Sequence, residues 1–265
     1  MCDGWYAEPY AGGAGVALSL LFGDYASRIV INDLDRSVYS FWHSVLNETD
    51  ALCRRIRDTR LSIAEWRRQR RVQADKASAP LLELGFSTFF LNRTNRSGII
   101  ASGGVIGGLK QESEWGIDAR YNADDLIRRI ERIAAHADRI TLMEKDALEF
   151  VAWAKGNMPA KSLVYLDPPY FVKGQRKLYA NYYGPDDHAA VVAGLENSPW
   201  PWLVSYDAAP EICALYRAYR KSEYDLRYTA AGSYLGSEVM FFSPNLKVPR
   251  GVNPIDRDTF PVKRA

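Results

Sequence analysis

Short apolar runs rich in β-branched and aromatic residues recur along the chain and predict β-strands. Their sequences are RIVIND, RITLME, SLVYLD, PWLVSYD, YDLRYTA and EVMFFSP, at residues 28–33, 139–144, 162–167, 201–207, 224–230 and 238–244. Because these runs are almost continuously hydrophobic, they are typical of strands covered on both faces of a sheet. The pattern therefore predicts a sheet buried between layers of other elements.

Amphipathic helical patterns lie between several of the predicted strands. The clearest covers residues 123–137, where Leu126, Ile130, Ile133 and Ala137 recur at helical intervals. Strands that alternate with helices predict an α/β fold with a doubly wound, mostly parallel sheet. The last two strand candidates are joined by AGSYLGS without a helical pattern, so we expect them to form an antiparallel hairpin at the sheet edge.

Residues 56–122 break the alternation of strands and helices. This segment is rich in Arg, Gly, Asn and Ser and shows no clear period, which indicates an inserted domain or a long functional loop. We therefore divide the chain into a first catalytic part at residues 1–55, an insert at 56–122 and a second catalytic part at 123–265.

Composition narrows the class of protein. With 265 residues, of which 47% are hydrophobic, the chain can bury one sizeable core or one core that carries an insertion. It contains no apolar run of the roughly 20 residues that a membrane span requires, and its start lacks the regions of a signal peptide. We expect a cytoplasmic protein without membrane contact. Cys2, Cys53 and Cys213 are far apart, which predicts neither a disulfide framework nor a metal site.

Positive charge is concentrated in one segment, although the net charge of the chain is only +2. Residues 54–71 carry eight arginines against Asp58 and Glu65. Two interpretations remain open for this segment. Such a run is often the solvated face of a helix, and the spacing of its apolar residues is helical. It would equally supply the salt-dependent part of an affinity for nucleic acid.

A glycine-rich turn and an acidic residue favour a nucleoside ligand. The turn EPYAGGAG, at residues 8–15, precedes an apolar helix that we expect to begin near Val16, and it lets backbone N–H groups approach a ligand. It matches neither nucleotide-binding glycine pattern, which argues against an NTPase or a hydride-transfer enzyme. Asp33 ends the next strand, where an acid can accept both hydroxyls of a ribose. The alternative is that Asp33 or Asp35 caps the following helix.

Two further acids follow predicted strands. Asp146 could accept from an adenine amino group or could cap the helix that starts at Ala147. Asp167 is followed by Pro168, Pro169 and Tyr170, and the two prolines alone would end a strand. An exocyclic amine needs acceptors that localise its lone pair, and the Asp167 carboxylate and Pro168 carbonyl could serve. Tyr170 offers a flat face for a flipped base.

A series of motifs in this chain resembles the Dam-like, D12 class of adenine-N6-specific DNA methyltransferases. The series is EPYAGGAG, INDLD, FFLNRTNRSGI, DPPY, LYANYYGPDDH, WLVSYDAAPEICALY and SEVMFFSP, in the order of that family. The resemblance implies a Rossmann-like catalytic domain with an inserted target-recognition domain. It also implies methyl transfer from S-adenosylmethionine to adenine N6 in double-stranded DNA after base flipping.

The same resemblance implies roles for individual residues. Catalysis is expected from Asp167, Pro168, Pro169 and Tyr170. The cofactor is expected to contact Glu8, Tyr10, Gly12, Gly13, Asp33, Asp146, Ala147 and Asp167. DNA is expected to contact Asn92, Arg93, Asn95 and Arg96 at the start of the recognition region. No metal is expected, the protein is expected to act as a monomer, and a cognate restriction endonuclease is a candidate partner.

Two departures from the family keep alternatives open. Members usually carry a Gly-Gly-Lys segment upstream of the glycine loop, whereas this chain begins at Met1-Cys2-Asp3, with a first strand of a few residues around Trp5 and Tyr6. Either the true start lies upstream, or the chain is a prophage-type copy with impaired cofactor binding. After NRSGI, the run ASGGVIGGLKQESEWGIDARYN also departs, so the recognition sequence cannot be transferred. Cytosine N4 methylation and a DNA-binding homologue without catalysis remain the alternative functions.

Overall fold

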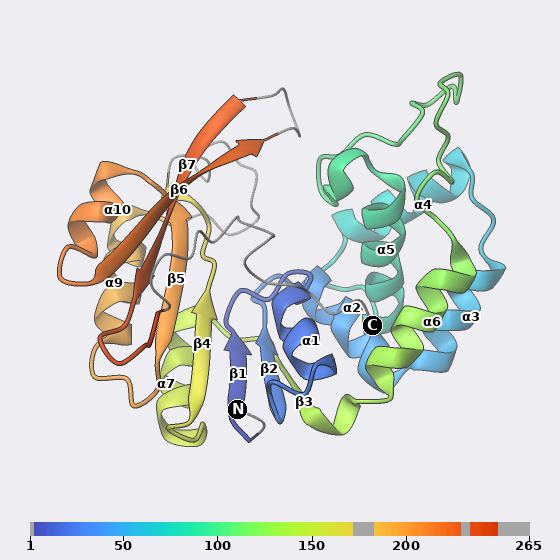
Figure 1. Ribbon diagram of the computed structural model, residues 1–265. Coiled ribbons are helices and arrows are strands. Elements are labelled where there is room, and N and C mark those ends of the chain that lie inside the picture. Colours follow the sequence, from blue (N-terminus) through green and yellow to red (C-terminus); the bar gives the residue numbers. More distant parts are fainter. Residues whose placement is uncertain (1–2, 172–182, 229–233, 249–265) are drawn as a thin grey trace.

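A computed structural model describes residues 3–171, 183–228 and 234–248 of the chain (Figure 1). The part of each predicted strand or motif that falls on residues 172–182, 229–233 or 249–265 lies outside the described residues, including the first five residues of LYANYYGPDDH.

The described strands form one sheet in the order β3-β2-β1-β4-β5-β7-β6. The bounds are β1 Trp5–Glu8, β2 Arg28–Asn32, β3 Ile140–Met143, β4 Ser162–Leu166, β5 Trp202–Asp207, β6 Arg220–Tyr228 and β7 Tyr234–Phe242. The neighbouring pairs from β3 to β5 are parallel, whereas β7 is antiparallel to both β5 and β6. The predicted α/β fold with a parallel sheet and an antiparallel C-terminal hairpin is confirmed, and β6 begins four residues before the predicted strand at 224–230.

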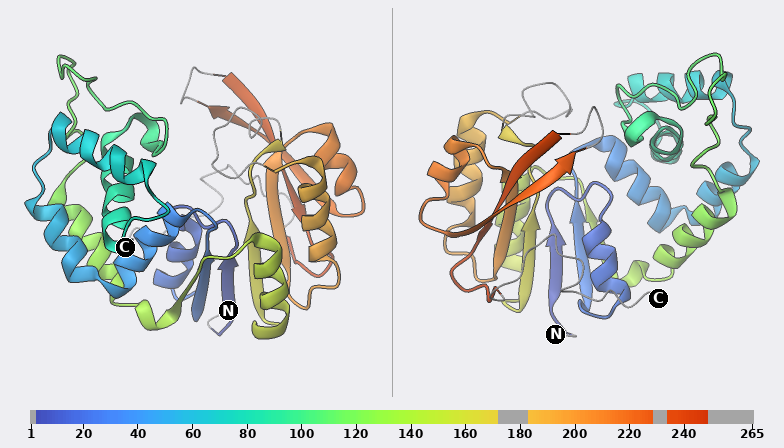
Figure 2. Two further views of the ribbon diagram at one scale, coloured as in Figure 1. Left: turned by 180° about the vertical axis from the view of Figure 1, so that it is seen from behind. Right: turned by 45° about the horizontal axis from the view of Figure 1, so that its top comes forward.

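Successive side chains of the central strands point to opposite faces of the sheet. In β2, Ile29 and Ile31 join one buried cluster, while Val30 between them joins the other. The first cluster continues into α1 (Gly15–Phe22), and the second is closed by α7 (Ala147–Asn157) and α9 (Pro185–Leu195). Figures 1 and 2 show these helices on the two sides of the sheet, with the short α10 (Pro210–Leu215) beside α9. The continuous hydrophobicity of the strands follows from this double cover.

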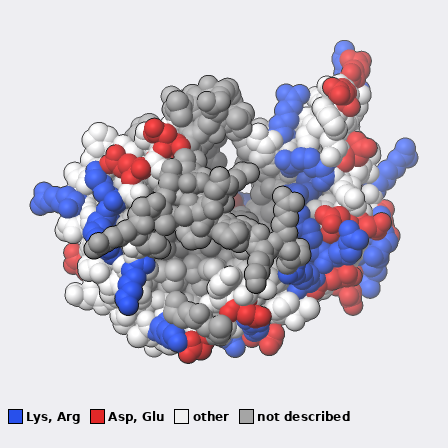
Figure 3. Space-filling view, in the orientation of Figure 1, with Lys and Arg blue, Asp and Glu red and all other residues white. Residues whose placement is uncertain are grey.

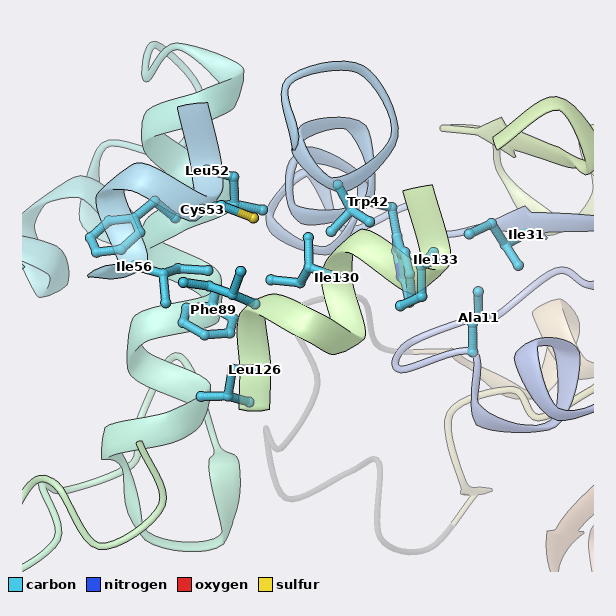
Figure 4. Packing of buried hydrophobic residues seen from close by; sticks show 14 of the residues in the cluster. Ala11, Ile31, Trp42, Leu52, Cys53, Ile56, Phe89, Leu126, Ile130 and Ile133 are labelled. Atoms are coloured by element: carbon cyan, nitrogen blue, oxygen red, sulfur yellow. The ribbon is translucent and has the colours of Figure 1, made fainter. Parts of the chain in front are cut away.

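The remaining helices pack together beside the sheet (Figures 1 and 2). They are α2 (Arg36–Asn47), α3 (Thr49–Asp58), α4 (Ile63–Ala74), α5 (Leu81–Thr94) and α6 (Ala123–Ala134), with the short 3-10 turns η1 (Arg96–Gly98) and η2 (Ala137–Arg139). Figure 4 shows Leu52, Ile56, Phe89 and Ile130, from α3, α5 and α6, pointing toward one another. The first buried cluster is therefore shared between the sheet and this helical part.

The segment 56–122 contains two full helices, α4 and α5. The helical spacing within residues 54–71 indicated α4, whereas the sequence pattern did not reveal α5. In α5, Leu84, Phe86, Phe89 and Phe90 are buried together with the polar residues Ser87 and Thr88, so burial extends around most of the helix. A helix that is buried on nearly every side has no polar stripe. The absence of a period in this segment therefore reflected deep burial of α5 rather than a lack of structure.

Candidate functional site

One pocket lies at the carboxyl ends of the parallel strands. It has a volume of about 300 Å³ and is lined in part by Tyr10, Gly12, Asp33, Ala147 and Asp167. In parallel α/β sheets this edge is where ligands bind, next to the point at which the strand order reverses. That point is between β1 and β4 in this sheet. With Pro169, which also lines it, the pocket brings together six of the site residues that the sequence singled out.

The glycine-rich turn is tied to the end of β2. The backbone N–H of Gly12 donates to Oδ2 of Asp33 over 2.9 Å, and Oδ1 of Asp33 accepts from the backbone N–H of Asp35 at 2.9 Å. Gly12 has a φ of +46°, a conformation that favours glycine. A Cβ placed on Gly12 or Gly13 would meet nothing within 4 Å, so both glycines face open space. Burial raises the pKa of Asp33, while its two backbone hydrogen bonds act in the opposite direction.

Glu8 lies behind the turn rather than on the pocket wall. Its Oε1 accepts from the hydroxyl of Tyr6 and from the backbone N–H of Ala17, each over 3.0 Å. The side chain is buried, and this burial raises the pKa of Glu8 to about 7. Glu8 therefore joins β1 to α1 and fixes the position at which the turn begins.

Two other acids cap helices, a role that the sequence offered as an alternative to ligand binding. Asp35 caps α2 by accepting from the backbone N–H of Ser37 at 2.9 Å, and it also pairs with Lys76 at 2.9 Å. Asp146 caps α7 by accepting from the backbone N–H of Leu148 at 2.8 Å. A side-chain oxygen at this position satisfies an N–H that the helix cannot satisfy itself. Asp146 thus has a structural role that does not depend on a ligand.

The Asp-Pro-Pro-Tyr segment is held by side chains of the neighbouring strands. Asp167 Oδ1 accepts from Oγ of Ser205 at 2.8 Å, and the Tyr170 hydroxyl donates to Oε1 of Glu238 at 2.8 Å. The backbone N–H of Phe171 donates to Oδ1 of Asp207 at 2.9 Å. Because two successive prolines have no N–H, this stretch cannot continue the sheet ladder. Anchoring from β5 and β7 takes its place.

Asp167 lines the pocket and is exposed there. Partial desolvation by the surrounding protein raises the pKa of Asp167, the hydrogen bond from Ser205 lowers it, and the nearby carboxylate of Glu238 raises it further. An acid in such surroundings keeps a strong tendency to accept hydrogen bonds when it is ionised. The arrangement suits an acceptor that meets an N–H group in the pocket.

The four residues expected to contact DNA lie at the end of α5 and have different surroundings. The Asn95 side chain is fully buried: Oδ1 accepts from Nε1 of Trp66 at 2.7 Å, and Nδ2 donates to the Ile99 carbonyl at 2.7 Å. DNA has no access to this side chain, so the expectation for Asn95 is corrected to a structural role. Arg96 is exposed.

Asn92 and Arg93 are half-buried and lie next to each other. Oδ1 of Asn92 accepts from Nη2 of Arg93 at 2.7 Å. Burial lowers the pKa of Arg93, and the nearby guanidinium groups of Arg120 and Arg129 lower it further. Within the described residues none of these three arginines forms an ion pair. They form an uncompensated group of positive charge, which we call the Arg93 cluster.

The arginine-rich segment 54–71 corresponds to α3 and α4, in agreement with its helical spacing. Several of its arginines are exposed, and Arg68 pairs with Glu65 at 3.0 Å. Figure 3 shows basic side chains gathered over the helical part, with acidic side chains among them. The segment is at least in part a solvated helix surface, and the Arg93 cluster is the more concentrated positive site.

Some residues of the site were missed by sequence reasoning. They are Leu34, Lys145 and Tyr183 on the pocket wall, and Ser205 and Glu238 behind Asp167 and Tyr170. No local sequence pattern points to Tyr183, but in the structure its hydroxyl lies 3.1 Å from that of Tyr10. The available signal for Ser205 and Glu238 was a polar residue inside an otherwise apolar strand, because buried polar groups need partners.

The described residues contain no group of three or more His, Cys, Asp or Glu that could hold a metal ion. In the same part of the chain, no helix combines the length and the apolar character needed to cross a membrane.

Comparison with known families gives one match that spans most of the chain. The model of a family described as D12 class N6 adenine-specific DNA methyltransferase matches residues 3–229. Among curated proteins no significant sequence match was found. The matched range contains the glycine-rich turn, Asp33 and the Asp-Pro-Pro-Tyr segment, so the pocket lies within it.

Solved structures that are similar include several methyltransferases. A putative methylase from Haemophilus influenzae is 9% identical with a TM-score of 0.35, and the match covers 91% of this chain and 87% of that chain. An rRNA methyltransferase from Streptomyces viridochromogenes is 15% identical with a TM-score of 0.37, covering 91% and 76%. A SAM-dependent methyltransferase from Agrobacterium tumefaciens is 9% identical with a TM-score of 0.36, covering 92% and 56%.

Proposed function

Because the chain belongs to the D12 class of N6 adenine-specific DNA methyltransferases, we propose that its pocket binds S-adenosylmethionine beside the adenine amine that is to be methylated. The observation that carries this proposal is a single pocket lined by the glycine-rich turn, by Asp33 and by Asp167. Two ligands that must react with each other can meet in such a pocket.

The residues present suit a nucleoside cofactor. Gly12 and Gly13 face open space and allow close approach to the backbone of the turn. Asp33 is fixed by backbone N–H groups and can still accept from ribose hydroxyls, because each carboxylate oxygen has more than one acceptor site. Leu34 and Ala147 offer apolar surface for an adenine ring. We assign Tyr10 to the same wall, and Glu8 and Asp146 to positions that support it.

Asp167 and Pro168 would hold the target amine. An exocyclic amino group of a base is a poor nucleophile, because its lone pair is delocalised into the ring. Acceptors at its two N–H bonds localise that lone pair, and the Asp167 carboxylate and Pro168 carbonyl supply two acceptors with little freedom to move. When bound, S-adenosylmethionine supplies an activated methyl group. The task of the protein is then mainly to position the amine in line with it.

Tyr170 would pack its ring against the flipped base. Aromatic faces stack on bases of any sequence, and enzymes that modify a base inside a duplex must first take it out of the stack. The hydroxyl of Tyr170 is held by Glu238, which limits rotation of the ring. Pro169, on the pocket wall between Asp167 and Tyr170, keeps the backbone of this segment extended.

The segment 56–122 would serve as the target-recognition region, and the protein would act as a monomer on double-stranded DNA, with a restriction endonuclease as a candidate partner. The β6–β7 hairpin and the helices α4 and α5 rise on the side of the sheet where the parallel strands end (Figure 1). Asn92, Arg93 and Arg96 are on that helical part. Phosphate contacts from such residues position a protein on DNA, while contacts to base edges define the sequence that is read.

A single assay tests the proposal. The protein is incubated with labelled S-adenosylmethionine and mixed-sequence DNA, and the labelled nucleoside is identified after digestion. We expect N6-methyladenine, and we expect the Asp167→Ala variant to lose at least about a hundredfold in rate because an acceptor of the reacting amine is removed. Labelled N4-methylcytosine would contradict the assignment of the base. Undiminished activity of Asp167→Ala would contradict the mechanism.

A further inference from the structure

Asp167 is the end of a chain of three side chains that crosses from β4 to β5 and back. The Tyr165 hydroxyl lies 2.9 Å from Oγ of Ser205, and Oγ of Ser205 lies 2.8 Å from Oδ1 of Asp167. Ser205 is only 2% exposed, so its hydroxyl has little access to water that could replace these partners. The position of the Asp167 carboxylate therefore depends on a residue of the neighbouring strand.

The chemistry of the three groups determines the direction of both hydrogen bonds. An ionised carboxylate can only accept, so the one proton of the Ser205 hydroxyl is donated to Asp167. The hydroxyl of Tyr165 must then donate to Ser205. Because Ser205 is engaged on both sides, it cannot turn away without breaking two hydrogen bonds.

Several other titratable groups face Asp167 from the strands around it. They are Tyr6 and Glu8 of β1, Tyr165 of β4, Tyr224 of β6 and Glu238 of β7. Asp33, Asp35 and Lys145 line the same pocket. Burial and the negative charge of Glu238 oppose ionisation of Asp167, whereas the hydrogen bond from Ser205 favours it.

We infer that Ser205 is a positioning residue that holds the Asp167 carboxylate ready to accept a hydrogen bond from the target amine. This inference rests on the proposed function, since it needs Asp167 to contact that amine. Because Ser205 already uses one acceptor site of Oδ1, Oδ2 offers more acceptor capacity to an incoming N–H. The hydrogen bond from Ser205 also favours the ionised form of Asp167, and only this form offers full acceptor capacity on both oxygens.

The test compares Ser205→Ala with Ser205→Thr, which keeps a hydroxyl, and with Ser162→Ala as a matched control. Ser162 is also buried on this sheet, at the opposite end of β4, where its hydroxyl donates to the Pro159 carbonyl at 2.6 Å. For Ser205→Ala we expect kcat to fall about tenfold, with the Kd for S-adenosylmethionine within about twofold of wild type. The acidic limb of the kcat profile should move to higher pH. Ser205→Thr should restore most of the wild-type kcat and should return the acidic limb close to its wild-type position.

A second readout does not depend on activity. The ionisation of Asp167 is followed by carbon-detected NMR of the carboxyl groups, with the signal assigned by its loss in Asp167→Asn. We expect the Asp167 carboxyl to titrate at higher pH in Ser205→Ala and to be unchanged in Ser162→Ala. If Ser205→Ala does not fold, Tyr165→Phe should shift the titration in the same direction by a smaller amount, because it removes only the donor to Ser205.

The outcomes separate this inference from the proposed function. If Asp167→Ala is inactive while Ser205→Ala differs from wild type only in Tm, as Ser162→Ala does, the positioning role of Ser205 is wrong and the proposed function stands. If Asp167→Ala retains wild-type activity, the role proposed for Asp167 is wrong, and the inference about Ser205, which rests on that role, is wrong with it. An unshifted Asp167 titration in both Ser205→Ala and Tyr165→Phe would overturn the inference without reference to activity.

Discussion

At the scale of single residues, acids at the ends of parallel strands have different roles that depend on their neighbours. Asp33 and Asp167 face the pocket, and each accepts hydrogen bonds that fix its carboxylate. Asp146 caps α7, and Glu8 is buried behind the glycine-rich turn. The same residue type at equivalent positions therefore serves the ligand site in two cases and the scaffold in the other two.

Glu8 predicts a pH dependence of stability. Its pKa in the folded protein is about 7, above the usual value of 4.5, because burial disfavours the charged form. The unfolded chain thus releases this proton at lower pH, and the contribution of Glu8 to stability is lost as pH rises from about 4.5 to about 7. Replacing Glu8 by Gln keeps an acceptor for Tyr6 and Ala17 but removes the ionisation.

The stability of Glu8→Gln relative to wild type should accordingly increase between pH 4 and pH 8, by up to about 3 kcal/mol. Urea unfolding of both proteins at each pH measures this difference and cancels the titration of all other groups. A difference that stays constant across this range would show that Glu8 ionises in the folded protein as it does in the unfolded chain.

At the scale of elements, the close crossing of α2 and α5 depends on one glycine. A Cβ on Gly85 would lie 2.4 Å from the carbonyl oxygen of Ser40 and 2.4 Å from Oγ of Ser44. Backbone oxygen cannot move aside as a flexible side-chain end can, so even a methyl group must separate the two helices. Since α5 carries Asn92 and Arg93, its position on α2 also places part of the proposed DNA surface.

Gly85→Ala should therefore lower the free energy of unfolding by about 1–3 kcal/mol, as overpacking of a buried contact does. Gly156→Ala is the matched control, because Gly156 is also in a helix but a Cβ there would meet nothing within 4 Å. Alanine favours helix over glycine, so the control should be neutral or more stable by up to about 1 kcal/mol. Urea unfolding measures the free energy of unfolding of both variants. If the two substitutions change it equally, the crossing of α2 and α5 can adjust to a Cβ at position 85.

The elements also show what local sequence patterns can and cannot reveal. Strands such as β4 are continuously apolar because both faces are covered, so they were predictable. Burial on nearly every side hid α5, since a uniformly buried helix has no polar stripe. Asp33 and Asp167 were found because they end strands. Ser205 and Glu238 were not, because each contacts a residue 38 or 68 positions away, across the sheet.

At the scale of the whole molecule, the cofactor pocket and the helical part meet at the glycine-rich turn. A second pocket of about 340 Å³ shares Gly12 and Val38 with the first and is lined on its other side by Asn92, Arg93 and Arg129. The glycine-rich turn thus lies between the Arg93 cluster and the proposed cofactor site. DNA phosphate at the cluster would relieve the repulsion among its arginines, and this would place the duplex beside the methyl donor.

Arg129 and its neighbour Arg128 on α6 allow this arrangement to be tested. Arg129 belongs to the Arg93 cluster, whereas Arg128 pairs with Asp125 at 3.1 Å on the same helix. If Arg129 contacts a phosphate, Arg129→Ala should weaken DNA binding and reduce the slope of log affinity against log salt by about 0.9, the value for one phosphate contact. Arg128→Ala should leave the slope unchanged.

Fluorescence anisotropy with a labelled duplex at several salt concentrations measures both slopes, and calorimetry with S-adenosylmethionine should give the same Kd for both variants. Equal slopes for Arg129→Ala, Arg128→Ala and wild type would remove the Arg93 cluster from the DNA surface. The positive charge that binds DNA would then have to come from other exposed arginines of the helical part, such as those of α3 and α4. In that case the duplex would not bind at the second pocket, and the description of the cofactor site would not change.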